Sequence, residues 1–224
     1  MTAIEPVRKD IENKGRIKKY SAPLRLWHWL SALIITGSLL TVLMNSTLFS
    51  RKATTALINN QAQEANATIA PAQVKSIAHG ISDSIWQIHI YFGYCLAALL
   101  LFRIGLEFFQ LADQKLIRKI KAAYRQYYIT KKNREIARHE LLVKLLYALF
   151  YLLLLTMVVT GLCLVFEDDV PALKAIHAIR EIHGFVMYLI LAFIAVHLAG
   201  VFLAERKDGK GIVSDMINGG REEK

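Results

Sequence analysis

The side chains most able to do chemistry in this sequence are its histidines. There are seven, and four of them lie within or at the edge of long apolar stretches: His28, His89, His183 and His197. An ionisable ring is costly to bury among apolar side chains, so its presence there points to a function. Imidazole nitrogens are also common ligands of iron. These four residues are therefore the first candidates for a metal or cofactor site.

These histidines lie in three apolar stretches, and a fourth stretch, 145–166, contains none. All four stretches lack Asp, Glu, Lys and Arg, and they are 18 to 22 residues long. A helix rising about 1.5 Å per residue crosses a hydrocarbon layer of about 30 Å in that length. We therefore predict an all-α membrane protein, a single four-helix transmembrane bundle over residues 1–224. The expected helices are about 24–44, 85–109, 141–166 and 183–204.

The spacing of the histidines places them at two depths. His183 and His197 are 14 residues apart. This spacing puts them on nearly the same helix face and separates them by about 21 Å. Because successive spans alternate in direction, His28 shares one level with His197, and His89 shares the other with His183. A low-spin haem iron takes two axial nitrogens, so the pattern predicts two bis-histidine haems, one at each level.

The net charge of +10 is unevenly distributed. Of the 28 Lys and Arg residues, 23 lie in segments 1–25, 103–144 and 205–224. Cytoplasmic loops carry the basic excess in membrane proteins. We therefore place both termini and the basic loop 107–140 in the cytoplasm, and the outer loop 45–84 on the other side of the membrane. The basic residues mark topology and contact with anionic lipid, and nucleic-acid binding is excluded.

Small and basic residues close to the histidines suit a large anionic cofactor. Gly93 and Gly184 would leave room for a macrocycle beside the helix faces that carry the ligands. Arg25 lies three residues before His28, and Arg180 lies three residues before His183. The two arginines are predicted to bind haem propionates. Alternatively, they are ordinary basic residues that extend from span ends to the membrane surface.

The other histidines and the cysteines carry weaker signals. We expect His79 to be solvated in the outer loop and His177 to lie on the outer surface. His139, at the cytoplasmic start of the third span, is either a surface residue or part of a quinone pocket. Cys95 and Cys163 lie inside apolar spans and suit packing. Because no Cys-x-x-Cys is present, zinc ribbons, iron–sulfur ligation and covalently attached c-type haem are excluded.

The two longer loops differ in character. The central loop predicts a basic amphipathic helix lying on the membrane surface, with its apolar side chains between residues 116 and 128. In the outer loop, we expect residues 59–67 to be weakly helical or mobile. This stretch contains no candidate catalytic or binding residues.

Several short motifs together resemble one known family, the bacterial cytochrome b561-type proteins. They are most similar to the b-type cytochrome subunit of membrane-bound nickel–iron hydrogenases, and the gamma subunit of formate dehydrogenase shares the layout. The motifs are Ala22-Pro23-Leu24-Arg25-Leu26-Trp27-His28-Trp29-Leu30, Ile88-His89 with Gly93, Leu101-Phe102-Arg103-Ile104, Thr160-Gly161, His183-Gly184 with His197, and Met216-Ile217-Asn218-Gly219-Gly220-Arg221.

The resemblance implies a cytochrome with two haem b groups that transfers electrons between an outer-side redox partner and the quinone pool. His28 and His197 would ligate the inner haem iron, and His89 and His183 the outer one. The partner would be a hydrogenase small subunit, a dehydrogenase or a c-type cytochrome. Glu140 is a candidate proton donor or acceptor beside quinone, because a carboxyl group near a hydrophobic site can exchange protons near neutral pH.

Three other functions are compatible with parts of this pattern. A stand-alone quinone-reactive oxidoreductase of the cytochrome b561 type would use the same residues. A transporter with a histidine relay would need carboxylates or broken helices at mid-membrane, which the spans lack. A structural membrane anchor would leave the two-level pairing of histidines unexplained.

Overall fold

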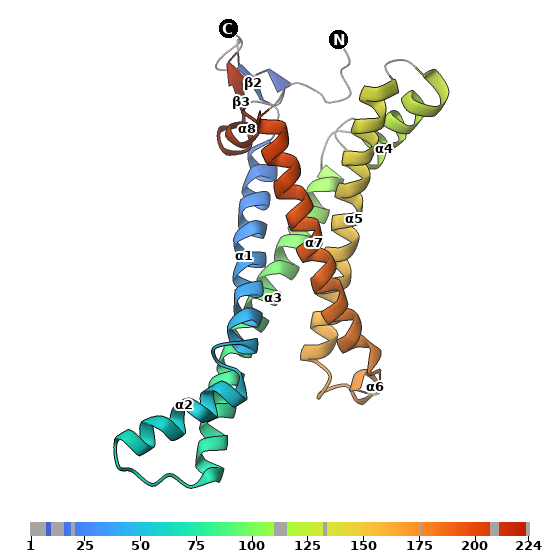
Figure 1. Cartoon of the computed structure of the whole chain (residues 1–224). Coiled ribbons are helices and arrows are strands. Elements are labelled where there is room, and N and C mark those ends of the chain that lie inside the picture. The colour runs from blue at the N-terminus through green and yellow to red at the C-terminus, as the bar shows by residue number, and fades with distance from the viewer. Residues whose placement is uncertain are drawn as a thin grey trace. The chain divides into compact units, whose positions relative to one another are not determined.

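The computed structural model describes residues 8–9, 16–18, 21–109, 116–131, 134–174, 176–206 and 211–222 (Figure 1). Most of these residues are helical, which confirms the all-α class. The helices are α1 (Ala22–Ser46), α2 (Arg51–Glu64), α3 (Pro71–Phe109), α4 (Leu116–Arg125), the π-helical η2 (Gln126–Thr130), α5 (Arg134–Val165), α6 (Pro171–Lys174), α7 (Ala178–Arg206) and α8 (Ile212–Asn218).

Four helices are long and apolar enough to cross a membrane, and they confirm the four expected spans. They cover Ala22–Ser46, Pro71–Phe108, Ala137–Val165 and Ala178–Arg206. Large apolar side chains are exposed along them, among them Leu33, Leu101 and Phe185 at 63 to 69% exposure. Apolar surface on this scale would be unfavourable in water and suits contact with lipid.

One span begins much earlier than predicted. Helix α3 starts at Pro71, whereas the expected start was residue 85. The prediction followed the charge-free stretch, whereas the helix also includes Lys75 and Asp83, which precede that stretch. Proline is well suited to a first helical turn, because its missing N–H would have no intrahelical partner there.

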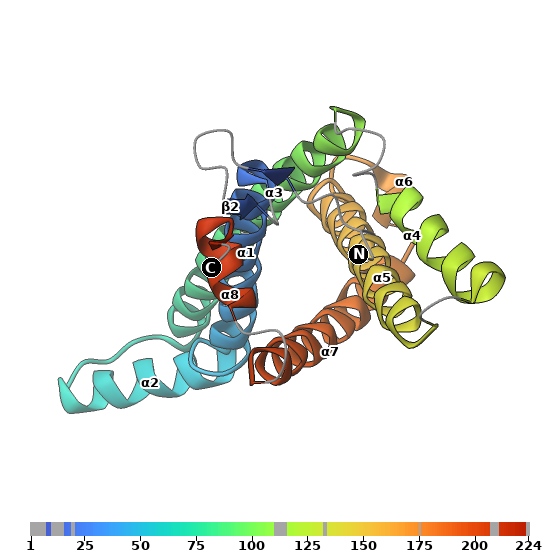
Figure 2. The same cartoon turned by 90° about the horizontal axis from the view of Figure 1, so that it is seen from above.

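The chain divides into two compact units, whose boundaries fall inside α1 and α3. Unit 1 comprises residues 1–29 and 99–224, and unit 2 comprises residues 30–98. Within unit 1, α5 and α7 lie side by side and α4 runs along α5 (Figures 1 and 2). The buried side chains of α5 and α7 include Leu153, Leu154, Val186 and Ile190.

Short strands near the beginning and the end of the chain pair with one another in unit 1. Strands β1 (Arg8–Lys9), β2 (Arg16–Lys18) and β3 (Gly220–Glu222) form an antiparallel sheet in that order. Helix α8 ends at Gly219, whose φ of 96° is a conformation that glycine adopts without strain. The sequence did not predict these strands, because two or three residues are too few to show an alternating pattern.

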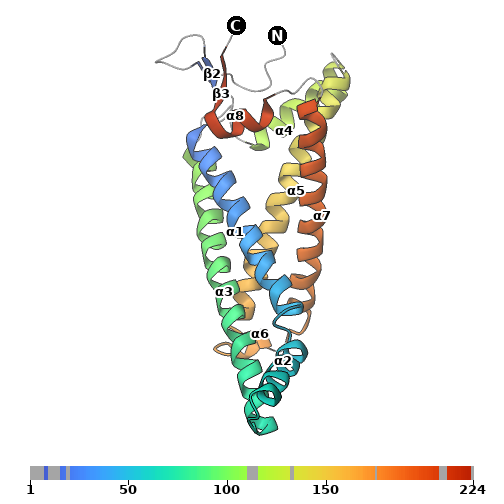
Figure 3. The ribbon, with the colours of Figure 1, turned by 60° about the vertical axis from the view of Figure 1, so that its left-hand side comes forward.

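Unit 2 contains a helical hairpin that the sequence did not predict. Helix α2 folds back along the first turns of α3 (Figure 3). The Ser50 side chain accepts a hydrogen bond from the Ala53 backbone at the start of α2. Residues 59–64 of the stretch predicted to be weakly helical or mobile are helical, but the helix begins earlier, at Arg51, and the chain turns after Glu64.

The central segment confirms the predicted amphipathic helix. Helix α4 and the π-helical turn η2 occupy residues 116–130. Ala123 is fully buried, whereas Arg118 and Lys121 are exposed. The turn ends at Lys131, whose φ is 56°.

Candidate functional site

Two of the predicted ligands lie next to each other in unit 1. His28, in the second turn of α1, and His197, near the end of α7, have ring centroids 6.3 Å apart. The His197 ring is stacked on Phe193 at 6.0 Å, and Phe193 is stacked on Phe150 of α5 at 4.8 Å. The edge of His28 meets Trp29 at 5.2 Å. Aromatic rings therefore hold both imidazoles in position.

The geometry of this pair fits a single metal ion between the two rings. Metal–imidazole bonds of about 2.0–2.1 Å from opposite sides leave ring centroids about 6 Å apart. The observed interplanar angle of 60° is compatible, because each ring can turn about its own metal–nitrogen bond. Direct hydrogen bonding between two imidazoles would bring the ring centroids closer than this.

Unpartnered polar atoms give a second test of fit. His28 Nδ1 and Arg25 Nε are buried and have no hydrogen-bond partner among the residues that the structure describes. The two residues are one turn apart on α1. Buried polar atoms are rarely left without partners. An anionic cofactor edge would bring a partner to Arg25 Nε at this end of the helix.

His89, in unit 2, is held by α1. Its Nδ1 lies 3.1 Å from Thr41 Oγ1 and 3.3 Å from the Ser38 carbonyl oxygen. The Thr41 hydroxyl donates its only proton to the same carbonyl at 2.6 Å, so its oxygen can only accept from the imidazole. Nδ1 therefore carries the proton and the lone pair is on Nε2, which is the tautomer that a metal ligand needs.

His183, in unit 1, shows the same arrangement on another pair of helices. Its Nδ1 lies 2.9 Å from Thr160 Oγ1 of α5. The Thr160 hydroxyl donates to the Thr156 carbonyl at 2.7 Å, so it accepts from His183 Nδ1–H. A Cβ atom on Gly161 would stand 3.2 Å from His183 Cε1, which explains glycine at this position. The lone pair again is on Nε2.

The four predicted ligands thus divide into two environments. His28 and His197 are brought together in unit 1, as their shared level predicted. His89 belongs to unit 2 and His183 to unit 1, so their pairing stays a prediction. The described residues contain no group of three or more His, Cys, Asp or Glu side chains that could hold a metal ion.

The predicted propionate ligands already have partners. Arg25 Nη1 donates to the Ile217 carbonyl at 2.6 Å, and its guanidinium covers Gly219 of the C-terminal segment. Arg180 is exposed and forms an ion pair with Glu167 at 2.8 Å. Only Arg25 retains a buried nitrogen without a partner, so its role beside an anionic cofactor is the better supported of the two.

Gly93 and Gly184 both have open space beside them. A Cβ atom at either position would meet no described atom within 4 Å. Their assignment to the edge of a macrocycle stays a prediction. The closest glycine contact lies elsewhere in unit 2, where a Cβ on Gly37 would stand 2.6 Å from the Phe92 ring.

The remaining candidates of the sequence analysis lie at span ends. His139 is exposed near the start of α5, and the side chain of Glu140 lies outside the described residues. His177 is exposed in the turn before α7, as expected for a surface residue. His79 lies in helix α3 rather than in a loop, where it is half-buried and lines a hollow.

A buried polar cluster was missed by the sequence analysis. Arg103 of α3 is 9% exposed, and its Nε donates to the Tyr151 hydroxyl of α5 at 2.9 Å. Its Nη1 pairs with Glu107 at 3.2 Å, and Glu107 accepts from the Leu116 backbone at the start of α4. The Tyr151 ring also packs against Trp27, the residue before His28, at 5.6 Å. The cluster therefore fixes the chain on either side of the histidine pair.

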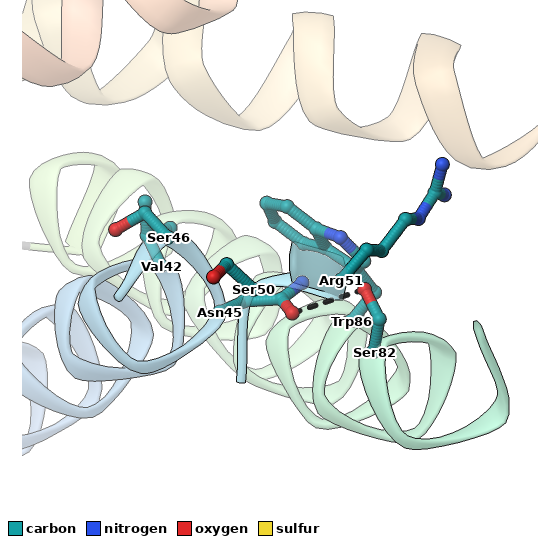
Figure 4. Close-up of a pocket in the computed structure, with 7 residues that line it drawn as sticks. All are labelled: Val42, Asn45, Ser46, Ser50, Arg51, Ser82 and Trp86. Atoms are coloured by element: carbon teal, nitrogen blue, oxygen red, sulfur yellow. Dashed lines mark hydrogen bonds between the residues drawn. The ribbon is translucent and has the colours of Figure 1, made fainter. Parts of the chain in front are cut away.

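A hollow of about 320 Å³ opens beside His89 in unit 2. Trp86 lines it together with Arg51 and the hydrogen-bonded side chains of Asn45 and Ser82, which are 3.0 Å apart (Figure 4). The Trp86 ring meets the His89 ring edge to face at 5.4 Å. Trp86 thus connects this hollow to a predicted ligand.

The sequence as a whole matches one family. A family model described as prokaryotic cytochrome b561 covers residues 19–219. No curated protein and no solved structure matches the chain. The matched region includes all four spans and all four candidate ligands. The chain belongs to the prokaryotic cytochrome b561 family.

Proposed function

We propose that this chain is a dihaem b-type cytochrome of the bacterial inner membrane. It carries electrons between a redox partner on its outer side and the quinone pool, as the membrane subunit of a respiratory complex such as a hydrogenase. Membership of the family supports haem b binding and electron transfer in a membrane. When bound, haem supplies one-electron chemistry at its iron, and the protein sets ligands, burial and nearby charge.

The pair formed by His28 and His197 carries the proposal. Two imidazoles from different helices lie with their ring centroids 6.3 Å apart and their planes tilted by 60°. Phe193 and Trp29 hold the rings, and Arg25 lies one turn away with a buried nitrogen that has no described partner. In the proposal, these two histidines hold the inner haem iron and Arg25 neutralises a propionate.

His89 and His183 form the second pair in the proposal. Thr41 and Thr160 lie within hydrogen-bond distance of Nδ1 of the two rings, and with the proton on Nδ1 the ligating atom would be Nε2 in each. The 14-residue spacing of His183 and His197 on α7 supplies the separation between two iron centres. Two haems at these two depths would let electrons cross most of the hydrocarbon layer of the membrane.

Quinone would react near the inner pair, at the start of α5. His139 is exposed there, and Glu140 follows it in the chain. The Glu140 carboxyl group would exchange protons with quinone. If Glu140→Gln leaves quinone turnover and its pH profile unchanged, this part of the proposal fails.

The orientation rests on charge. The segments 1–25, 103–144 and 205–224 hold 23 of the 28 Lys and Arg residues. In the proposal these segments are cytoplasmic, together with both termini, and the α2 hairpin is on the outer side. Fusion of a reporter active on only one side, placed after residue 222 or between α2 and α3, tests this orientation.

Haem content tests the central proposal. We expect the purified chain to show sharp b-type bands on reduction with dithionite and two haems per chain in a pyridine haemochrome assay. His28→Ala and His89→Ala should each lose one haem and keep the other. Folded protein without haem would refute the proposal. One haem per chain would retain the function and refute one pair, and the two variants identify which.

A further inference from the structure

The hairpin between the first two spans is a folded structure with a core of its own. Helix α2 packs on the first turns of α3 through a buried seam made of small or β-branched side chains: Thr54, Val74, Ala78 and Ser82, all at most 4% exposed. The Ser82 hydroxyl also donates to the Asn45 side chain at the end of α1. The hairpin is therefore positioned against the helices that bear it.

The length of α3 places this hairpin outside the membrane. Its 39 residues make a helix of about 58 Å, whereas the hydrocarbon layer is about 30 Å thick. The polar α2 lies beside the end of α3 that precedes the charge-free stretch. The hairpin therefore suits a water-facing position beyond that end of the charge-free stretch.

The basic residues of the hairpin are gathered in one place. Segment 45–84 contains three Lys and Arg residues, and all three line one hollow of about 780 Å³: Arg51, Lys52 and Lys75. His79 and Asn59 also line it. The two carboxylates of the segment, Glu64 and Asp83, do not, and Glu64 accepts from Gln61. The hollow therefore presents positive charge and hydrogen-bond donors without a compensating acid.

This basic hollow adjoins the hollow beside His89. Arg51 lines both of them, and the second contains Trp86, whose ring meets His89 at 5.4 Å (Figure 4). Trp86 is 42% exposed. A partner seated over Arg51 would therefore lie next to an aromatic ring that touches a predicted haem ligand.

We infer that the hairpin is a docking surface for the carboxylate-rich face of a soluble one-electron redox protein. The inference rests on the proposed function, and it names the chemistry of the outer partner. Complementary charge raises the rate of encounter and orients the partner. One electron then passes from the reduced partner, which is oxidised, to the iron that His89 would ligate, which is reduced. No bond breaks and no proton moves.

A charge-matched pair of variants tests the inference on the haem-loaded full chain. The test variant is Arg51→Gln/Lys52→Gln/Lys75→Gln, which removes three positive charges from the hollow. The control is Leu57→Glu/Asn60→Glu/Gln63→Glu, which changes the net charge equally at exposed positions of α2 that do not line the hollow. The probe is a reduced, strongly acidic flavodoxin, and both its binding and the second-order rate of haem reduction are measured.

We expect the test variant to bind flavodoxin less tightly and to be reduced about tenfold more slowly at low salt, with the difference lost at high salt. The control should stay within about twofold of the parent chain, because steering is greatest for charges in the contact area. Reduction by the cationic hexaammineruthenium(II) should be as fast or faster in the test variant, which shows that this variant is folded and loaded.

Equal binding and rates in all three chains, or an equal loss in the control, would overturn the docking surface. So would a test variant that loses only its affinity for anionic vesicles, because the hollow would then bind lipid head groups. A parent chain without haem would instead refute the proposed function. The two failures are therefore distinguishable.

Discussion

The hydrogen bond between Thr160 and His183 makes a prediction that separates a haem ligand from an ordinary buried histidine. Thr160→Val removes the hydroxyl and keeps the shape of the side chain. The acceptor at 2.9 Å from His183 Nδ1 is then lost. If His183 ligates iron through Nε2, its ring becomes a weaker donor, because a hydrogen bond from Nδ1–H raises the basicity of the ligand.

The size of the effect has an upper bound. A neutral hydrogen bond contributes about 0.5–1.5 kcal/mol net, and its strength cannot change between oxidation states by more than its whole value. For a one-electron couple, in which about 59 mV equals a tenfold change, this bound is about 20–65 mV. A weaker donor stabilises ferric iron less. One of the two haem midpoint potentials should therefore rise by no more than this amount, and the other should stay constant.

The assay is a redox titration of the α-band, with haem per chain measured in parallel. Thr156→Val is the matched control, because its hydroxyl donates to the Leu152 carbonyl one turn earlier on the same helix. Thr160→Ser should restore the parent potential. A Thr160→Val chain with two unshifted potentials, or an equal shift in Thr156→Val, would refute the assigned tautomer and the role of His183.

Two further predictions concern the stability of the fold. Gly37→Ala should lower the free energy of unfolding by about 1–3 kcal/mol, since the new methyl group would stand 2.6 Å from the Phe92 ring. Gly80→Ala, where a Cβ meets no described atom, should raise stability slightly, and equal effects in thermal melts would contradict the close approach. Tyr151→Phe should destabilise by about 1–3 kcal/mol, because buried Arg103 Nε loses its acceptor. A melt identical to that of the parent chain would show that water replaces the hydroxyl.

The spans and the proximity of His28 and His197 were predictable, because both depend on simple periodicity. Charge-free stretches identify spans by length, and a 14-residue interval fixes the face and separation of two residues on one helix. The contact between His28 and His197 followed from the same reasoning. To predict that contact, only the direction of each span and the depth of each histidine along its span were needed.

The α2 hairpin and the threonines were not predictable in this way. The hairpin seam uses Thr54, Ala78 and Ser82, which do not form an apolar stripe, so the segment lacked the usual signal of an amphipathic helix. Thr41 and Thr160 lie in apolar spans, where threonine commonly bonds to its own helix backbone. Their second contact, to a histidine on another helix, depends on packing that the sequence does not encode locally.

The two histidine environments differ in a way that bears on the direction of electron flow. Both predicted outer ligands donate from Nδ1 to a threonine that is itself bonded to backbone, whereas His28 Nδ1 has no described partner. Ligands with such hydrogen bonds are stronger donors and lower the reduction potential of the iron. In the proposed dihaem chain, the outer centre should therefore have the lower potential, and electrons should run inward to quinone. Redox titration of His89→Ala, which keeps only the inner haem, should show the higher potential of the parent chain. Retention of the lower one would reverse the inferred direction.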